Sequence, residues 1–194
     1  MRNDYREAKQ KLRYQVRAAL RQIPAQQRAT ASTQARALLK AQTQWRAAQS
    51  ILFFASLPEE LDVWPLMAEA LAAGKRVALP RFVPAARGYE AFQVLDPETD
   101  LELGQFGIRE PRGRCARFSL GRLDLILVPG IAFDLQGGRL GRGKGYYDQL
   151  LGGLRGNKCG VAFDQQVLDE IPMAPHDMRL DCILTPTRWV VVRA

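Results

Sequence analysis

Glycine and positive charge are concentrated in one short segment, residues 137–145. Five of these nine residues are glycine, and Arg139, Arg142 and Lys144 add three cations. Glycine lets backbone amides approach phosphate oxygens closely, and the cations supply the opposite charge. Ordering so many glycines and like charges together is costly unless an anion is bound. The segment therefore predicts a polyphosphate-binding loop rather than a set of solvated turns.

The loop departs from two familiar phosphate-binding motifs. Residues 138–144 fit the P-loop pattern G-x-x-x-x-G-K, but Gly145 stands where that pattern needs a hydroxyl for magnesium. The loop also begins well beyond the preceding apolar run, which ends near Val128. The dinucleotide fingerprint fails because Gly141, Gly143 and Gly145 are spaced G-x-G-x-G. Magnesium ligands must come from elsewhere in the chain, and a nicotinamide enzyme is disfavoured.

Short apolar runs indicate the strands that must position this loop. The predicted strands are residues 50–55, 76–79, 90–95, 124–128, 159–163, 182–184 and 189–192. Helical spacing predicts helices over residues 4–23, 26–49, 64–73 and from about 146 onward. Helices between short, non-alternating apolar strands imply crossover connections, so we expect an α/β fold with a mainly parallel central sheet of about seven strands and helices on both faces. The 194 residues suit one domain, in which basic helices over 4–49 pack onto an α/β core over 50–194.

The net charge of +8 is located in the amino-terminal quarter of the chain. Residues 1–50 carry 11 Lys or Arg against two Asp or Glu, whereas the remainder is nearly balanced. Lys9, Arg13 and Arg17 recur at i, i+4 and i+8 and form a basic stripe on the first predicted helix. Such a stripe is typical of a solvated helix face, and it also suits a polyanion such as nucleic acid, an acidic membrane surface or ATP. Charge alone leaves these alternatives open.

Hydropathy and cysteine usage predict the compartment. No apolar run approaches the roughly 20 residues needed to span a bilayer, and the first ten residues are polar and charged. Cys115, Cys159 and Cys182 are far apart and show no Cys-x-x-Cys spacing, so we expect reduced packing residues rather than disulfides or a zinc site. These observations predict a cytoplasmic protein.

Around the glycine loop the sequence resembles the 5-formyltetrahydrofolate cyclo-ligase family, also called methenyltetrahydrofolate synthetases. The hallmark Val-Pro-Gly-x-Ala-Phe-Asp, followed by Arg-Leu-Gly-x-Gly-x-Gly-Tyr-Tyr-Asp, matches residues 128–134 and 139–148. Weaker similarities occur at residues 9–13, 56–62 and 175–181, so that motifs in the family's order cover nearly the whole chain. The resemblance implies a three-layer α/β fold. It also implies ATP-dependent cyclisation of 5-formyltetrahydrofolate to 5,10-methenyltetrahydrofolate, with release of ADP and phosphate.

The resemblance also implies roles for individual residues. ATP would be held by Lys9, Arg13, Arg139, Leu140, Gly141, Arg142, Gly143, Lys144, Gly145, Tyr146 and Tyr147. The folate would contact Ala55, Glu60, Arg142, Gly143, Lys144, Gly145 and Tyr146. Arg142 and Lys144 would be catalytic, and Asp148 and Asp181 would bind Mg²⁺. The expected partners are therefore ATP and 5-formyltetrahydrofolate, with or without additional glutamates. We expect a monomer with no nucleic-acid or membrane partner.

The chemistry of the implied reaction explains why cations are needed. An N-formyl group is an amide, and its oxygen is too poor a leaving group for a neighbouring amine to expel. Phosphorylation of the formyl oxygen makes the carbon electrophilic, so that the N10 amine can attack it and phosphate can leave. The protein's task is then positioning and charge neutralisation, as in phosphoryl transfer generally. No nucleophilic Ser or Cys is required.

Several polar candidates also have a purely structural interpretation. Asp148 would lie in the first turn of a helix, where the dipole favours a carboxylate, and Asp181 and Glu60 suit turns. Magnesium commonly takes only one or two carboxylates together with phosphate and water oxygens, so a sparse set of ligands is no obstacle. His176, the single histidine, is expected to belong to a structural turn rather than to act as a general base.

Two other classes of protein compete with the ATP-dependent enzyme. The basic amino terminus would suit an RNA-binding module, but the chain has no basic strand pair interleaved with aromatic residues. A sugar-phosphate isomerase could share the architecture, because fold does not determine function. Such an enzyme would need no ATP, and the cations paired with two separated carboxylates suit a metal-bound nucleotide better.

Overall fold

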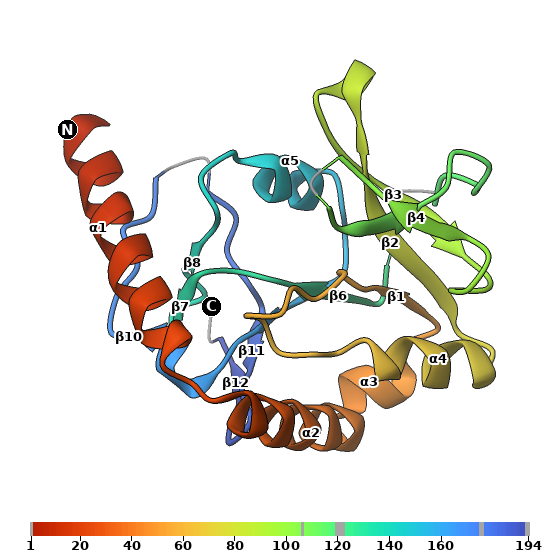
Figure 1. Ribbon diagram of the computed structural model, residues 1–194, viewed down its shortest axis with the longest axis horizontal. Coiled ribbons are helices and arrows are strands. Elements are labelled where there is room, and N and C mark those ends of the chain that lie inside the picture. The colour runs from red at the N-terminus through yellow and green to blue at the C-terminus, as the bar shows by residue number, and fades with distance from the viewer. Residues whose placement is uncertain (1, 106, 119–122, 175–176, 193–194) are drawn as a thin grey trace.

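A seven-stranded sheet forms the centre of the computed structural model, which describes residues 2–105, 107–118, 123–174 and 177–192 (Figure 1). Its strands are β1 (Ser50–Leu52), β2 (Arg76–Val83), β3 (Gly88–Val94), β6 (Leu125–Val128), β9 (Asn157–Val161), β11 (Cys182–Leu184) and β12 (Trp189–Val191). They lie in the order β12-β11-β9-β6-β1-β2-β3. The four inner pairs are parallel and the two outer pairs antiparallel. The predicted α/β fold with a mainly parallel sheet is confirmed.

Helices cover both faces of this sheet. The helices are α1 (Arg2–Arg21), α2 (Ala25–Ala41), α3 (Thr43–Ala47), α4 (Pro65–Ala72) and α5 (Tyr146–Gly152), with short 3₁₀ turns at Pro84–Ala86 and Asp164–Gln166. Alternate strand residues point to opposite faces. Ile51 and Leu125 belong to the core that includes α2 and α4, whereas Leu52 and Ile126 pack in a second core with Leu150 of α5. Figure 1 accordingly shows α2, α3 and α4 below the strands and α5 above them, which makes three layers.

The predicted helix over residues 26–49 is divided in two. Gln42 adopts an extended backbone between α2 and α3, with φ of −79° and ψ of 144°. The break turns α3 so that Trp45 becomes buried and meets the Phe53 ring edge-on, with 6.2 Å between centroids. The sequence carries no glycine or proline at this point, so tertiary packing, and not a local breaker, ends α2.

Two small sheets were not predicted. One contains β7 (Ala132–Asp134), β8 (Arg139–Leu140) and β10 (Val167–Leu168), and the other is the hairpin of β4 (Leu101–Leu103) and β5 (Arg109–Pro111). The β7–β8 hairpin takes up the first part of the predicted glycine loop. Its turn is closed by Asp134, whose buried carboxylate accepts a hydrogen bond from the Gly138 amide at 2.7 Å. Only residues 141–145 therefore remain as an open loop before α5.

The order of the strands creates a crevice. The chain places β2 on one side of β1 and β6 on the other, so the connections after β1 and β6 leave the sheet in opposite directions. In open α/β sheets such a switch point leaves space at the carboxyl ends of the strands, where ligands bind. Residues 53–55, which follow β1, and residues 129–130, which follow β6, lie at this place.

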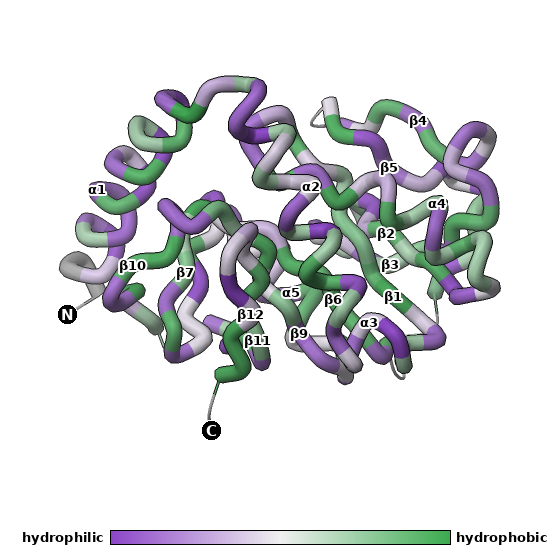
Figure 2. The backbone as a smooth tube through the Cα atoms, turned by 90° about the horizontal axis from the view of Figure 1, so that it is seen from below, coloured by the Kyte–Doolittle hydropathy of each residue, from purple (hydrophilic) through white to green (hydrophobic). Residues whose placement is uncertain are grey.

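Helix α1 is amphipathic and lies at one side of the molecule. Hydrophilic and hydrophobic segments alternate along it (Figure 2), and Val16 and Leu20 are buried in the core. Four basic residues, Arg6, Lys11, Arg17 and Arg21, lie on its exposed side, whereas Lys9 and Arg13 are partly buried. Within the described ranges, no helix has the combination of length and hydrophobicity that crossing a membrane requires.

Candidate active site

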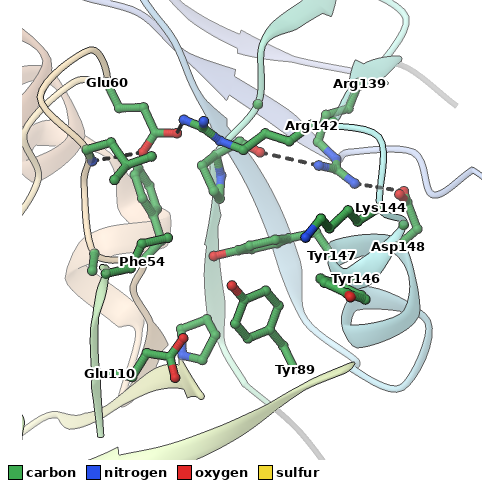
Figure 3. A pocket seen from close by; sticks show the side chains of 18 of the residues that line it. Phe54, Glu60, Tyr89, Glu110, Arg139, Arg142, Lys144, Tyr146, Tyr147 and Asp148 are labelled. Carbon is green, nitrogen blue, oxygen red and sulfur yellow. Dashed lines mark hydrogen bonds and ion pairs between the residues drawn. The ribbon is translucent and has the colours of Figure 1, made fainter. Parts of the chain in front are cut away.

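A pocket of about 300 Å³ lies at the carboxyl ends of β1 and β6 (Figure 3). Its lining includes six of the seven residues predicted to contact folate, namely Ala55, Glu60, Arg142, Lys144, Gly145 and Tyr146. The seventh, Gly143, does not line the pocket in this structure. Segments more than 80 residues apart in the chain, around Glu60 and around Arg142, thus meet at one place. The glycine loop and the segment that follows β1 therefore both line the pocket.

An ion pair joins these two segments. The Glu60 carboxylate accepts hydrogen bonds from Arg142 Nη2 at 2.8 Å and from the Leu57 amide at 3.1 Å, one on each oxygen. Burial raises the pKa of Glu60, although Arg142 and the Leu57 amide oppose the rise. Burial alone would lower the pKa of Arg142, but Glu60 and Glu59 reverse this and raise it. Both Glu60 oxygens are therefore occupied before any ligand binds.

A second ion pair supports the loop from beneath. Arg139 Nη2 donates to Asp148 Oδ1 at 2.7 Å, and the arginine side chain is only 2% exposed. Its other contacts are the Pro129 carbonyl oxygen at 3.4 Å and the Tyr147 ring at 5.9 Å. Because β8 buries it, Arg139 holds Asp148 in place at the pocket. Leu140, another predicted ATP contact, is 1% exposed in the core, so its side chain does not face the pocket.

Three tyrosines form an aromatic wall. The Tyr89 ring lies 5.8 Å from that of Tyr146 and 5.7 Å from that of Tyr147, and Phe82 extends the cluster at 5.3 Å from Tyr146. Burial raises the pKa of Tyr89 to about 12 and also raises that of Tyr147, so both hydroxyls remain protonated. Lys144 Nζ lies 5.8 Å from the Tyr146 ring centroid. The wall suits a planar ring next to a cation.

The amino-terminal helix carries two of the predicted ATP contacts, Lys9 and Arg13. Arg13 Nε donates to the Gly141 carbonyl oxygen at 2.9 Å, and burial together with the charge of Arg17 lowers the pKa of Arg13. Lys9 forms an ion pair with Asp177. Arg17, one turn further along α1, is exposed to solvent. The structure therefore places Arg13 against the loop and Lys9 against Asp177, and leaves Arg17 on the helix surface.

The structure does not bring together Asp148 and Asp181, the two residues predicted to bind Mg²⁺. Asp181 is exposed at the start of β11, the end away from the pocket, where it accepts a hydrogen bond from the Lys158 amide at 2.8 Å. Asp177 lies closer in the fold, because the backbone amide of the next residue, Met178, donates to Asp148 Oδ1 at 3.5 Å. Asp177 and Asp181 are only four positions apart in the sequence. The motif alone therefore could not show which of them lies nearer to Asp148. The predicted turn at His176 lies outside the described residues.

Glycine is required at two loop positions. Gly143 and Gly145 have φ values of 105° and 71°, a left-handed conformation that side chains rarely adopt. Gly145 is also the residue before α5, so its conformation sets the direction in which the helix begins. The loop carbonyls and amides are consequently presented by backbone geometry, while Arg142 and Lys144 project as exposed cations.

Among the pocket residues that sequence reasoning missed, three have polar side chains: Tyr89, Arg109 and Glu110. Glu110 is 5% exposed, and burial raises its pKa. Its Oε2 accepts a hydrogen bond from the Phe82 amide at 3.1 Å, while Oε1 is buried without a partner. Arg109 lies 5.2 Å over the Trp64 ring. From the sequence, an acidic residue in an arginine-rich connection is expected to be exposed to solvent. Glu110 is buried only because the β4–β5 hairpin folds against β2.

The pocket offers few ligands to a metal ion. In the part of the chain that the structure describes, no group of three or more His, Cys, Asp or Glu side chains could hold a metal. Asp148 contributes a carboxylate at the pocket, and Arg139 occupies one of its oxygens. Magnesium usually combines one or two carboxylates with phosphate and water oxygens. The residues therefore fit an ion that arrives with a nucleotide, and not one held by the protein alone.

Known proteins share both the sequence and the architecture. A model of the 5-formyltetrahydrofolate cyclo-ligase family matches residues 5–186. The chain is 34% identical over 145 residues to the 5-formyltetrahydrofolate cyclo-ligase of Escherichia coli, covering 73% of this chain and 80% of that protein. It is 30% identical over 195 residues to the protein of the same name from Mus musculus, covering 91% and 93%. The NMR structure of Aquifex aeolicus 5,10-methenyltetrahydrofolate synthetase superimposes with a TM-score of 0.86 at 32% identity, covering 96% of this chain and 93% of that chain.

Proposed function

The chain belongs to the 5-formyltetrahydrofolate cyclo-ligase family, and we propose that it closes 5-formyltetrahydrofolate into 5,10-methenyltetrahydrofolate while converting ATP to ADP and phosphate. One observation carries this proposal. In a single pocket, the cations Arg142 and Lys144 lie beside the tyrosine wall, so a phosphate and a planar ring can be bound next to each other.

The two parts of the pocket suit the two parts of the reaction. The rings of Tyr89, Tyr146 and Tyr147 offer faces against which the pterin ring can stack. The loop over residues 141–145 offers backbone amides and two exposed cations to the γ-phosphate. A formyl group on N5 of the stacked ring would then lie where the phosphate enters. Proximity of this kind replaces a bimolecular encounter with a positioned one.

The reaction proceeds in two displacements. The formyl oxygen attacks the γ-phosphorus and ADP leaves, which converts the amide into an electrophilic imidate-like phosphate ester. The N10 amine then attacks the same carbon, loses its proton, and phosphate leaves as the five-membered ring closes. Arg142 and Lys144 act by neutralising charge that develops on the transferred group. The ion pair with Glu60 keeps Arg142 in one position, so little reorganisation is needed during the step.

Helix α1 and Asp148 complete the nucleotide site in this proposal. Lys9 and Arg13 would neutralise the remaining phosphates; Arg13 contacts the loop at Gly141, and Lys9 lies one turn earlier on the same helix, paired with Asp177. Magnesium bound with the nucleotide would offset further phosphate charge, and Asp148 would hold it. The amino-terminal helices and the α/β core therefore act as one functional unit, consistent with one domain over residues 1–194.

Near-ultraviolet absorbance provides the test, because the conjugated methenyl bridge has a band that neither substrate has. We expect a rise that requires 5-formyltetrahydrofolate, ATP and Mg²⁺ together. Lys144→Ala should lower kcat about 100-fold or more, as loss of a positioned charge-stabilising group does. Lys40→Ala is the matched control, since Lys40 is 44% exposed on α2 and pairs with Glu69 far from the loop. Folded wild-type protein that gives no rise with any nucleoside triphosphate would refute the proposal.

A further inference from the structure

We propose that Glu110 recognises the amino-pyrimidinone edge of the folate's pterin ring, an inference that rests on the function proposed above. The residue lies in β5, on the hairpin that folds against β2, and its side chain lines the pocket. No part of the cyclisation chemistry described above uses it. Its role would be to orient and select the substrate, not to take part in bond making.

The state of the Glu110 carboxylate points to a missing partner. The residue is 5% exposed, and its Oε1 is buried with no hydrogen-bond partner within the described structure. A buried, unsatisfied carboxylate oxygen costs free energy, so a ligand that supplies donors there gains binding energy. Arg81 does not satisfy it, because this arginine donates to the Pro111 carbonyl oxygen at 3.1 Å and pairs with Glu102 at 3.8 Å.

Glu60, the other pocket glutamate, is in a different state. Arg142 and the Leu57 amide already occupy its two oxygens. Glu110 Oε1, in contrast, accepts no hydrogen bond within the described structure, so a donor placed there would add a contact without replacing one. Of the two pocket glutamates, Glu110 is therefore the one with an oxygen that lacks a donor, whereas Glu60 also positions the loop arginine.

The chemistry of the pterin ring fits this position. Its pyrimidinone edge presents two adjacent donors, the 2-amino group and N3–H, which match the two oxygens of a carboxylate in a charge-assisted, bidentate pair. This edge lies at the far end of the bicyclic ring from N5, which carries the formyl group. Figure 3 shows Glu110 at one side of the pocket and Arg139, Arg142 and Lys144 at the other, with Tyr89 and Tyr147 between them. Anchoring at Glu110 would thus direct N5 toward the cations.

The test measures binding and turnover separately. Binding of 5-formyltetrahydrofolate is measured calorimetrically for the wild type, Glu110→Gln and Glu102→Gln, and repeated with an analogue whose 2-amino group is replaced by methyl. Glu102 is the matched control, because it lies on the adjacent strand β4 with its side chain 41% exposed. Turnover is followed by methenyl absorbance at saturating ATP.

We expect the wild type and Glu102→Gln to bind the analogue about tenfold or more weakly than the substrate, as loss of a charge-assisted hydrogen bond implies. Glu110→Gln should bind the substrate about tenfold more weakly and discriminate against the analogue by roughly threefold or less, with kcat little changed. A merely structural role would weaken both ligands equally and leave the discrimination intact, which would overturn the inference. Unchanged affinity in Glu110→Gln would overturn it as well, with the proposed function still standing if the wild type makes the methenyl product. A wild type that neither binds nor converts the folate would overturn both.

Discussion

The carboxylate of Glu60 and the guanidinium of Arg142 are joined by a hydrogen bond of 2.8 Å across 82 residues of sequence. This pair connects the segment after β1 to the glycine loop and so closes one side of the pocket. The Glu60 side chain is 10% exposed and that of Arg142 is 42% exposed. Water can therefore solvate the arginine if the pair is broken, but it reaches the glutamate much less. Removing the arginine leaves a buried carboxylate without its cation.

Arg142→Ala should therefore affect both stability and activity. We expect the free energy of unfolding to fall by about 1–3 kcal/mol at neutral pH, the usual cost of an unsatisfied buried polar group, and kcat to fall about 100-fold. Urea unfolding and methenyl absorbance measure the two effects. Adding Glu60→Gln to the same chain should restore much of the stability but none of the activity, because the buried charge is gone.

A neighbouring acid provides the control for this pair. Glu59 lies 3.2 Å from Arg142 with its side chain 46% exposed, so Glu59→Gln should change stability by less than about 1 kcal/mol. If the double variant were as unstable as the sum of its single changes, the two residues would not be coupled in the way described.

Arg13 and Arg17 should differ sharply in their effect on nucleotide binding. Arg13 contacts the Gly141 carbonyl oxygen, whereas Arg17 is exposed one turn away on the same helix. Arg13→Ala should raise KM for ATP about tenfold or more with little change in KM for the folate, since a charge-assisted phosphate contact is lost. Arg17→Ala should change either value less than about twofold. If both variants raised KM for ATP equally, the positive charge of α1 would act at long range and not through a contact made by Arg13.

Magnesium dependence should distinguish the two predicted acidic ligands. Asp148 lines the pocket, while Asp181 lies exposed at the start of β11. Asp148→Asn should raise the Mg²⁺ concentration needed for half-maximal rate about tenfold or more. Mutating a residue that only hydrogen-bonds to a metal ligand already weakens metal binding by about tenfold, and loss of a ligand should weaken it at least as much. Asp181→Asn should leave it unchanged. A shift of similar size in Asp181→Asn would restore that residue to the site and contradict the placement.

The pH dependence of stability should reveal the buried state of Glu110. Burial raises its pKa above the usual 4.5, so the folded chain holds this proton more tightly than the unfolded chain. Stability from this group is present below the unfolded pKa and is lost as pH rises through the folded pKa. Glu110→Gln cannot ionise, so its free energy of unfolding relative to the wild type should increase as the pH rises from 4.5 into the neutral range. Urea unfolding across this range measures the difference, and a constant difference would show that Glu110 ionises normally.

The family and the framework of this protein could be predicted from the sequence alone. All seven strands of the main sheet were expected within a few residues of their observed positions. The fully buried β1, β6 and β11 show why, because a strand buried on both faces needs a continuous apolar run and leaves that signal locally. The glycine loop was expected for a similar reason, since the left-handed backbone at Gly143 and Gly145 requires that residue type wherever the chain is placed.

The partners of each polar side chain were decided only by the tertiary structure. The β7–β8 hairpin turned Arg139 into a buried support for Asp148, and the direction of β11 carried Asp181 away from the pocket. The folding of β5 against β2 buried Glu110, which local sequence presented as an ordinary surface acid. A carboxylate has the same local pattern whether it is solvated, paired or left without a partner. These states differ in desolvation and long-range contact, which arise only when distant segments meet.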